Sequence, residues 1–166
     1  MKTIIFLDID GVLNTEQWHL NEGQNAPQDQ YGDAFDPEAV ANLALIIAET
    51  GAEIVLSSTW KCFGLDGIKE MWKDRGLPGK VVGITPNTIS DEILLKVNLE
   101  EVEAGFLKGY EIKEWLSKDG EQVQNYAIID DVEGFLPEQK SHLVLVNATF
   151  GLRKKDAEKT IKVLNV

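Results

Sequence analysis

The chain has 166 residues, of which 43% are hydrophobic and 27% are charged, a composition typical of a folded globular domain. Its 28 acidic and 16 basic residues give a formal net charge of −12, so it has no general attraction for phosphate backbones. A single cysteine, Cys62, excludes an internal disulfide and fits a reducing compartment. We therefore expect one cytoplasmic domain over residues 1–166.

The first predicted element is a strand over Thr3–Leu7, a β-branched and apolar run that ends at Asp8 and Asp10. Near-continuous apolar runs of this length are typical of strands that are buried on both faces in a parallel sheet. The run is too short, and too soon followed by charge, for a signal peptide or a membrane span. We therefore expect no membrane association.

Residues 14–36 are polar, contain glycine and lack a clear periodicity. We predict a long loop here that serves as a flap or small cap, because long loops in compact domains often line binding sites. Asp36-Pro37 then begins a predicted helix, since proline suits the first helical position, and Gly51 ends it.

Apolar runs and helical periodicity alternate along the rest of the chain. They predict strands over 53–56, 81–84, 126–129 and 143–146, and helices over 68–73, 110–117 and 156–164. Residues 86–107 leave room for a small insertion. The alternation predicts an α/β fold, a Rossmann-like three-layer α/β/α sandwich with a mainly parallel sheet, whose site lies at the carboxyl ends of the strands.

Two pairs of carboxylates follow predicted buried strands. Asp8 and Asp10 are spaced to lie on one side of an extended chain, and Asp130 and Asp131 follow a later strand. Like charges about 4 Å apart repel by about 4 kcal/mol at an effective dielectric near 20, so a converging cluster needs compensation. A divalent cation with oxygen ligands supplies it, and we predict Mg²⁺ held by these four residues. Whether Asp130 or Asp131 is the direct ligand stays open, and the alternative is that these residues only cap strand ends.

Carboxylates also attack phosphorus and form an aspartyl-phosphate. In that chemistry Asp8 is the nucleophile. Asp10 then gives a proton to the leaving oxygen and later takes one from water.

Hydroxyl and ammonium groups that could bind the phosphoryl group lie elsewhere in the chain. Ser57 and Ser58 follow the strand over 53–56, where the alternative is a helix N-cap. Lys108 precedes the helix predicted from Tyr110, an unfavourable place for a lysine in the helix dipole, which favours a functional role. The isolated lysines 61 and 113 are its rivals.

These residues together resemble the motifs of the haloacid dehalogenase superfamily of phosphohydrolases, in the family's order. The four motifs are Phe6-Leu7-Asp8-Ile9-Asp10-Gly11-Val12-Leu13-Asn14, Ile54-Val55-Leu56-Ser57, Lys108 and Ile128-Ile129-Asp130-Asp131. The resemblance implies a Rossmann-like fold with a minimal cap and a Mg²⁺-dependent phosphatase. It makes Asp8 the nucleophile and a metal ligand, and Asp10 the general acid/base, with its backbone carbonyl on the metal.

The same resemblance implies that Ser57 and Lys108 bind the phosphoryl group, that Asp130 is the acidic metal ligand and that Asp131 supports it. The segment from Ala52 to Lys61 is similar to a subgroup of the superfamily found in multi-domain RNA-repair proteins. Members of that subgroup commonly carry arginine where Lys61 and Lys108 stand, and lysine lacks the bidentate fork of arginine.

The substrate stays open at this point. A phosphorylated small molecule, a nucleotide and a phosphorylated nucleic-acid end all fit the chemistry. Trp18, Tyr31 and Phe35 could stack on a base or pack within their own loop. The alternative to an enzyme is a non-catalytic module that binds phosphate or a partner molecule.

Overall fold

The computed structural model describes residues 2–22, 25–87 and 104–165 of the chain. Its elements are β1 (Lys2–Leu7), α1 (Glu16–Glu22), β2 (Gln28–Asp29), β3 (Gly32–Asp33), α2 (Pro37–Thr50), β4 (Glu53–Leu56), η2 (Thr59–Phe63), α3 (Gly64–Asp74), β5 (Val81–Ile84), α5 (Ala104–Asp119), β6 (Val123–Asp130), η3 (Pro137–His142), β7 (Leu143–Leu145) and α6 (Lys154–Leu164). None of these helices is long and apolar enough to cross a membrane.

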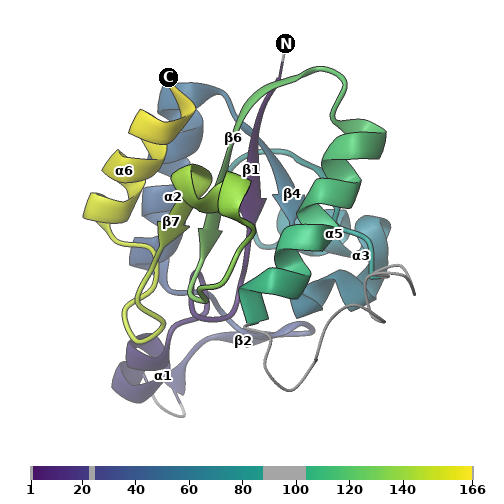
Figure 1. Ribbon diagram of the computed structural model, residues 1–166. Coiled ribbons are helices and arrows are strands. Elements are labelled where there is room, and N and C mark those ends of the chain that lie inside the picture. The colour runs from purple at the N-terminus through teal and green to yellow at the C-terminus, as the bar shows by residue number, and fades with distance from the viewer. Residues whose placement is uncertain (1, 23–24, 88–103, 166) are drawn as a thin grey trace.

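Five strands form one sheet in the order β5-β4-β1-β6-β7, and every neighbouring pair is parallel. The central strand β1 pairs with β4 on one side and β6 on the other, as Figure 1 shows. A strand in that position has helices over both faces, which explains why its sequence is a continuous apolar run. The predicted α/β fold with a mainly parallel sheet is confirmed.

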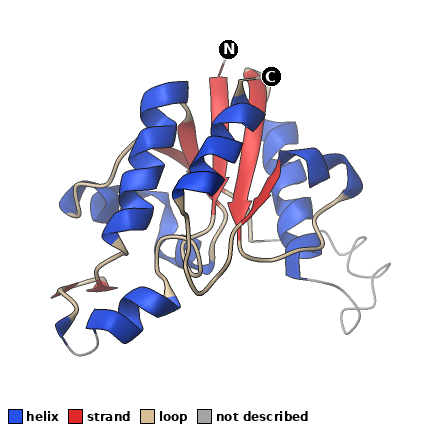
Figure 2. Cartoon of the chain, turned by 90° about the vertical axis from the view of Figure 1, so that its left-hand side faces the viewer, coloured by secondary structure: helices blue, strands red, loops and turns tan. Residues whose placement is uncertain are grey.

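Successive side chains of β1 enter two separate cores. Ile5 and Leu7 pack in the larger core with residues of α2, α3 and α6, whereas Ile4 and Phe6 pack in a smaller core with residues of α5. All four side chains are fully buried. Helices accordingly lie on both sides of the sheet in Figure 2, which gives the three layers.

Residues 14–36 are not the irregular loop that the sequence predicts, because they contain the helix α1 and the two-stranded ribbon of β2 and β3. Local side-chain bonds stabilise both. The Thr15 hydroxyl accepts a hydrogen bond from Trp18 N (3.2 Å) at the start of α1, and Asp29 accepts one from Tyr31 N (2.8 Å) in the hairpin turn. Helix α1 buries no residue, so it has no apolar stripe that periodicity could reveal.

The helix predicted over 110–117 begins earlier, at Ala104, so Lys108 lies within α5 and not before it. Two glycines of this helix allow close approach to neighbouring segments. Gly105 N donates to the Glu133 carbonyl (3.0 Å), and a Cβ on Gly109 would lie 2.6 Å from Gln139 Oε1. Most of the insertion expected within 86–107 lies outside the described residues.

Candidate active site

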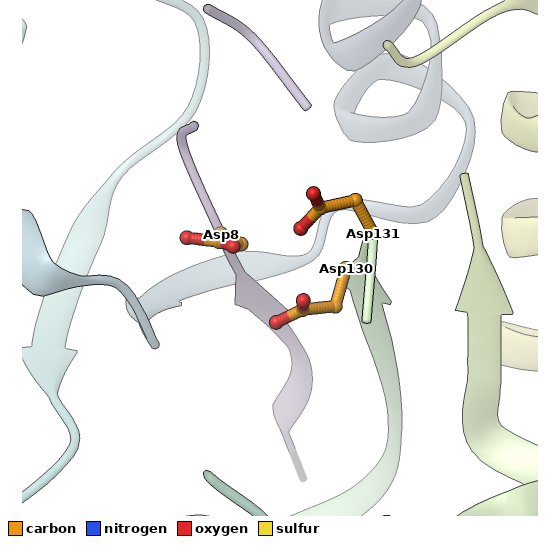
Figure 3. A group of neighbouring side chains, drawn as sticks. All are labelled: Asp8, Asp130 and Asp131. Carbon is orange, nitrogen blue, oxygen red and sulfur yellow. The ribbon is translucent and has the colours of Figure 1, made fainter. Parts of the chain in front are cut away.

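Three carboxylates meet at the carboxyl ends of β1 and β6. The register of these parallel strands pairs Leu7 with Ile129, so the next residues, Asp8 and Asp130, emerge side by side. Oxygen atoms of Asp8, Asp130 and Asp131 lie within 4.8 Å of one another, as Figure 3 illustrates. Among the described residues this is the acidic group that could hold a metal ion.

Gly11 makes room for this group. Its φ of +79° belongs to the left-handed region, and a Cβ there would lie 2.4 Å from Asp131 Oδ2. Any other residue would strain the turn and displace the Asp131 carboxylate. A glycine at position 11, in the first sequence motif, is therefore needed to leave space for the Asp131 carboxylate.

Lys108 joins the two buried carboxylates. Its Nζ lies 2.8 Å from Asp8 Oδ2 and 2.8 Å from Asp130 Oδ2. Burial lowers the pKa of Lys108, but the charges of Asp130 and Asp8 outweigh that effect and raise it above its usual value. The lysine is therefore held as a cation between the two aspartates.

Burial also shapes the two carboxyl groups. It raises the pKa of Asp8, although Lys108 opposes the shift, and burial together with the charge of Asp8 raises the pKa of Asp130 to about 7. Backbone amides add partners, since Ile9 N donates to Asp8 Oδ1 (2.8 Å) and Val132 N donates to Asp130 Oδ1 (3.1 Å). One ammonium group thus leaves the cluster with uncompensated negative charge.

Asp10 has different surroundings. Its side chain is exposed and does not belong to the group of three carboxylates. Trp60 Nε1 donates to both of its oxygens (3.2 and 3.1 Å), and Asn14 Nδ2 donates to Oδ1 (2.9 Å). Asp10 nevertheless lines the same cavity of about 390 Å³ as Asp8, Lys108 and others. Its part in a metal site through the backbone carbonyl stays a prediction.

The two predicted phosphate-binding serines differ. The Ser57 hydroxyl is buried and has no hydrogen-bond partner among the described residues, a situation that costs about 1–3 kcal/mol. Ser58 caps η2, where its hydroxyl accepts from Trp60 N (3.4 Å), and its part in phosphate binding stays a prediction. Neither serine lines the cavity, but the adjacent Thr59 does.

The rivals of Lys108 are engaged elsewhere. Lys61 pairs with Glu111 at 2.6 Å, and Lys113 pairs with Glu138 at 3.1 Å. Among the described residues, Lys108 is the lysine that lines the cavity.

The loop aromatics pack within the protein. Trp18 Nε1 donates to the Ala34 carbonyl (3.0 Å), Phe35 is buried, and the Tyr31 hydroxyl donates to Asp74 (2.8 Å). Sequence reasoning missed Trp60 and Asn14. Asn14 lies inside the first motif, a signal that could have found it, whereas nothing in the sequence links Trp60 to Asp10.

Residues 4–157 match the family model for the HAD domain in Swiss Army Knife RNA repair proteins. The chain belongs to this family of the haloacid dehalogenase (HAD) superfamily. Membership supports a hydrolase of the HAD type in general. The chain is also similar to the structure of a protein from Legionella pneumophila described as a HAD-superfamily (subfamily III A) hydrolase, with 14% identity, a TM-score of 0.41, and coverage of 99% of this chain and 84% of that chain. No curated protein matches the sequence.

Proposed function

We propose that this HAD domain is a Mg²⁺-dependent phosphatase that hydrolyses phosphomonoesters through an aspartyl-phosphate on Asp8. The observation that carries the proposal is the Asp8–Lys108–Asp130 cluster, in which Asp8 and Lys108 line the cavity. A cluster of this kind is costly to the fold unless a ligand uses it.

The three carboxylates fit a hard divalent cation. They offer oxygen ligands only, and the raised pKa of Asp130 reflects burial and negative charge that Lys108 leaves uncompensated. Asp8, Asp130 and Asp131 would hold the ion. Bound Mg²⁺ supplies a Lewis acid that neutralises charge on the phosphoryl oxygens.

The chain's own groups perform the proton and phosphoryl transfers. Lys108 and Ile9 N fix the two oxygens of Asp8, which attacks phosphorus as the ester P–O bond breaks. Asp10 gives its proton to the departing oxygen. Asp10 then accepts a proton from the water that attacks the aspartyl-phosphate, which releases inorganic phosphate and regenerates Asp8.

The substrate class is a narrower proposal. The family to which the chain belongs is named for RNA repair proteins, which favours a phosphorylated nucleic-acid end or a nucleotide over a sugar phosphate. The net charge of −12 requires that such a substrate bind through local contacts and not through the general field of the protein.

The first experiment measures hydrolysis of para-nitrophenyl phosphate by the wild-type protein and by Asp8→Asn, with Mg²⁺ and with a chelator. We expect Mg²⁺-dependent turnover that Asp8→Asn lowers by about 10⁴-fold or more, because the nucleophile is lost. Asp66→Asn, an exposed aspartate of α3, is the matched control and should keep full activity.

An Asp8→Asn protein with wild-type turnover would refute the mechanism. Absence of turnover on the aryl ester, on nucleotides and on 3′- or 5′-phosphorylated oligonucleotides would favour a non-catalytic phosphate-binding module. Turnover of sugar phosphates alone would refute the nucleic-acid substrate class and leave the mechanism intact.

A further inference from the structure

Asp10 is held by groups that the mechanism above does not use. The Trp60 indole N–H straddles both carboxylate oxygens at 3.2 and 3.1 Å, while Asn14 Nδ2 donates to Oδ1 at 2.9 Å. An exposed aspartate is normally free to sample several rotamers. Here donors from two segments, the turn after β1 and the helix η2, restrict it to one orientation beside the cavity.

Asn14 is itself oriented by a histidine. Its side-chain oxygen is in hydrogen-bond contact with His19 Nε2. Because the amide nitrogen faces the Asp10 carboxylate, the amide oxygen must face His19, and Nε2 must carry a hydrogen. A reversed amide would place its oxygen against the carboxylate and lose the contact with Asp10.

His19 is fixed on its other side. Its Nδ1 lies 3.3 Å from Asp33 Oδ2, a contact that is an ion pair when both ring nitrogens carry hydrogen. His19 belongs to α1 and Asp33 to β3, the two elements that lie beyond the carboxyl ends of the strands in Figure 1. Polar contacts thus run from Asp33 through His19 and Asn14 to Asp10, and they connect residues 14–36, the predicted small cap, to Asp10.

We propose that Trp60 and the chain Asn14–His19–Asp33 are positioning residues that aim the Asp10 carboxyl at the leaving-group oxygen. This inference rests on the proposed function and goes beyond it, because it assigns a role to the cap segment and to Trp60. Residues 14–36 contact Asp10, the proton donor, whereas the contacts described for Asp8 come from Ile9 N and Lys108.

The role has a chemical signature. A general acid matters most when the leaving oxygen is strongly basic, as in an alkyl alcohol, and least when the leaving group is already a stable anion, as in para-nitrophenolate. Misplacing the acid should therefore slow alkyl esters selectively. A variant that merely loosened the fold would slow all esters by the same factor.

The test measures kcat/KM for Trp60→Phe and His19→Ala on aryl and alkyl phosphomonoesters graded by the pKa of the leaving alcohol, with Mg²⁺ present. This constant reports steps only up to release of the alcohol, so later hydrolysis of the aspartyl-phosphate does not mask the effect. Trp72→Phe and His142→Ala are matched controls, since each removes a ring hydrogen bond to a backbone carbonyl away from Asp10.

We expect Trp60→Phe and His19→Ala to lower kcat/KM on alkyl esters by about tenfold or more and on para-nitrophenyl phosphate by less than about twofold. The controls should leave the slope against leaving-group pKa unchanged. In an Asp10→Asn background, Trp60→Phe should have no further effect, because both changes remove the same contribution.

Equal losses on every ester would overturn the positioning role, as would a Trp60→Phe effect that persists in the Asp10→Asn background. Full activity of both variants on alkyl esters would overturn it too. The turnover of para-nitrophenyl phosphate that survives in these variants shows that they fold. Absence of turnover in the wild-type protein would overturn the proposed function and the positioning role with it.

Discussion

Asp8 and Asp10 are two residues apart, yet the protein places them in opposite environments. Asp8 belongs to what we call the buried centre, Asp8, Lys108 and Asp130, where charges compensate one another at 2.8 Å. Asp10 is exposed and belongs to the Asp10 network, in which Trp60 and Asn14 are its neutral donors. Asp8 is therefore held by a charged partner, whereas Asp10 is held by uncharged hydrogen-bond donors.

The difference suits the two roles that we propose. A nucleophile must stay ionised in a water-poor site while an anionic substrate approaches, and a fixed cation makes that possible. A general acid/base must gain and lose a proton in each cycle, so a full positive charge against it would hinder protonation. Neutral donors orient the carboxyl group without that penalty.

The largest effect that separates the two regions should come from Lys108→Met. Loss of the lysine leaves Asp8 and Asp130 facing each other, so we expect the free energy of unfolding without metal to fall by about 3 kcal/mol. We also expect kcat to fall by about 10²–10³-fold with saturating Mg²⁺, because a cation beside the transferred group is lost. Urea unfolding and steady-state kinetics measure the two effects.

Lys61→Met is the matched control for this prediction. It strips Glu111 of a similarly close and buried partner, so stability should fall while kcat changes little. Loss of stability with unchanged kcat in Lys108→Met as well would mean that the lysine only balances charge. The contrast between the buried centre and the Asp10 network would then lose its functional meaning.

A smaller effect should distinguish Asp130→Asn from Asp10→Asn in Mg²⁺ binding. An ion at 100 times its dissociation constant stabilises a protein by about 2.7 kcal/mol, seen as a rise in the thermal midpoint. We expect Asp130→Asn to lose that rise and Asp10→Asn to keep it, because the Asp10 side chain lies outside the carboxylate group. Loss of the rise in Asp10→Asn and its retention in Asp130→Asn would place the ion at the other end of the cavity.

The fold and the buried centre follow from features that the sequence displays openly. The strands over 53–56 and 81–84 have the predicted bounds, because each is a short segment rich in β-branched residues. Parallel neighbours then bring the residues after their carboxyl ends together. The approach of Asp8 to Asp130 needs no information beyond strand order and register.

The contacts of the Asp10 network cannot be predicted from strand order and register. Trp60 and Asp10 are far apart in the chain, and their contact depends on how η2 turns after β4. No sequence pattern links His19 to Asn14 or Asp33, because these contacts arise where the short elements α1 and β3 fold back. Such elements are fixed by single caps and turns, which carry little periodic signal.

The subtlest test of the comparison is the pH dependence of Mg²⁺ binding. Burial and the charge of Asp8 raise the pKa of Asp130 to about 7, and a metal ion binds the ionised form. Below that pH the ion must displace a proton, so we expect its affinity to fall about tenfold for each pH unit under 7 and to level off above it. Calorimetric titration between about pH 5.5 and 8.5, a range that spans that value, measures the slope. Asp10→Asn should keep the wild-type slope, because the proton that competes with the ion resides in the buried centre. An affinity that does not change across the range would mean that Asp130 is already ionised there, and the buried centre would then hold its charge by means other than the ion.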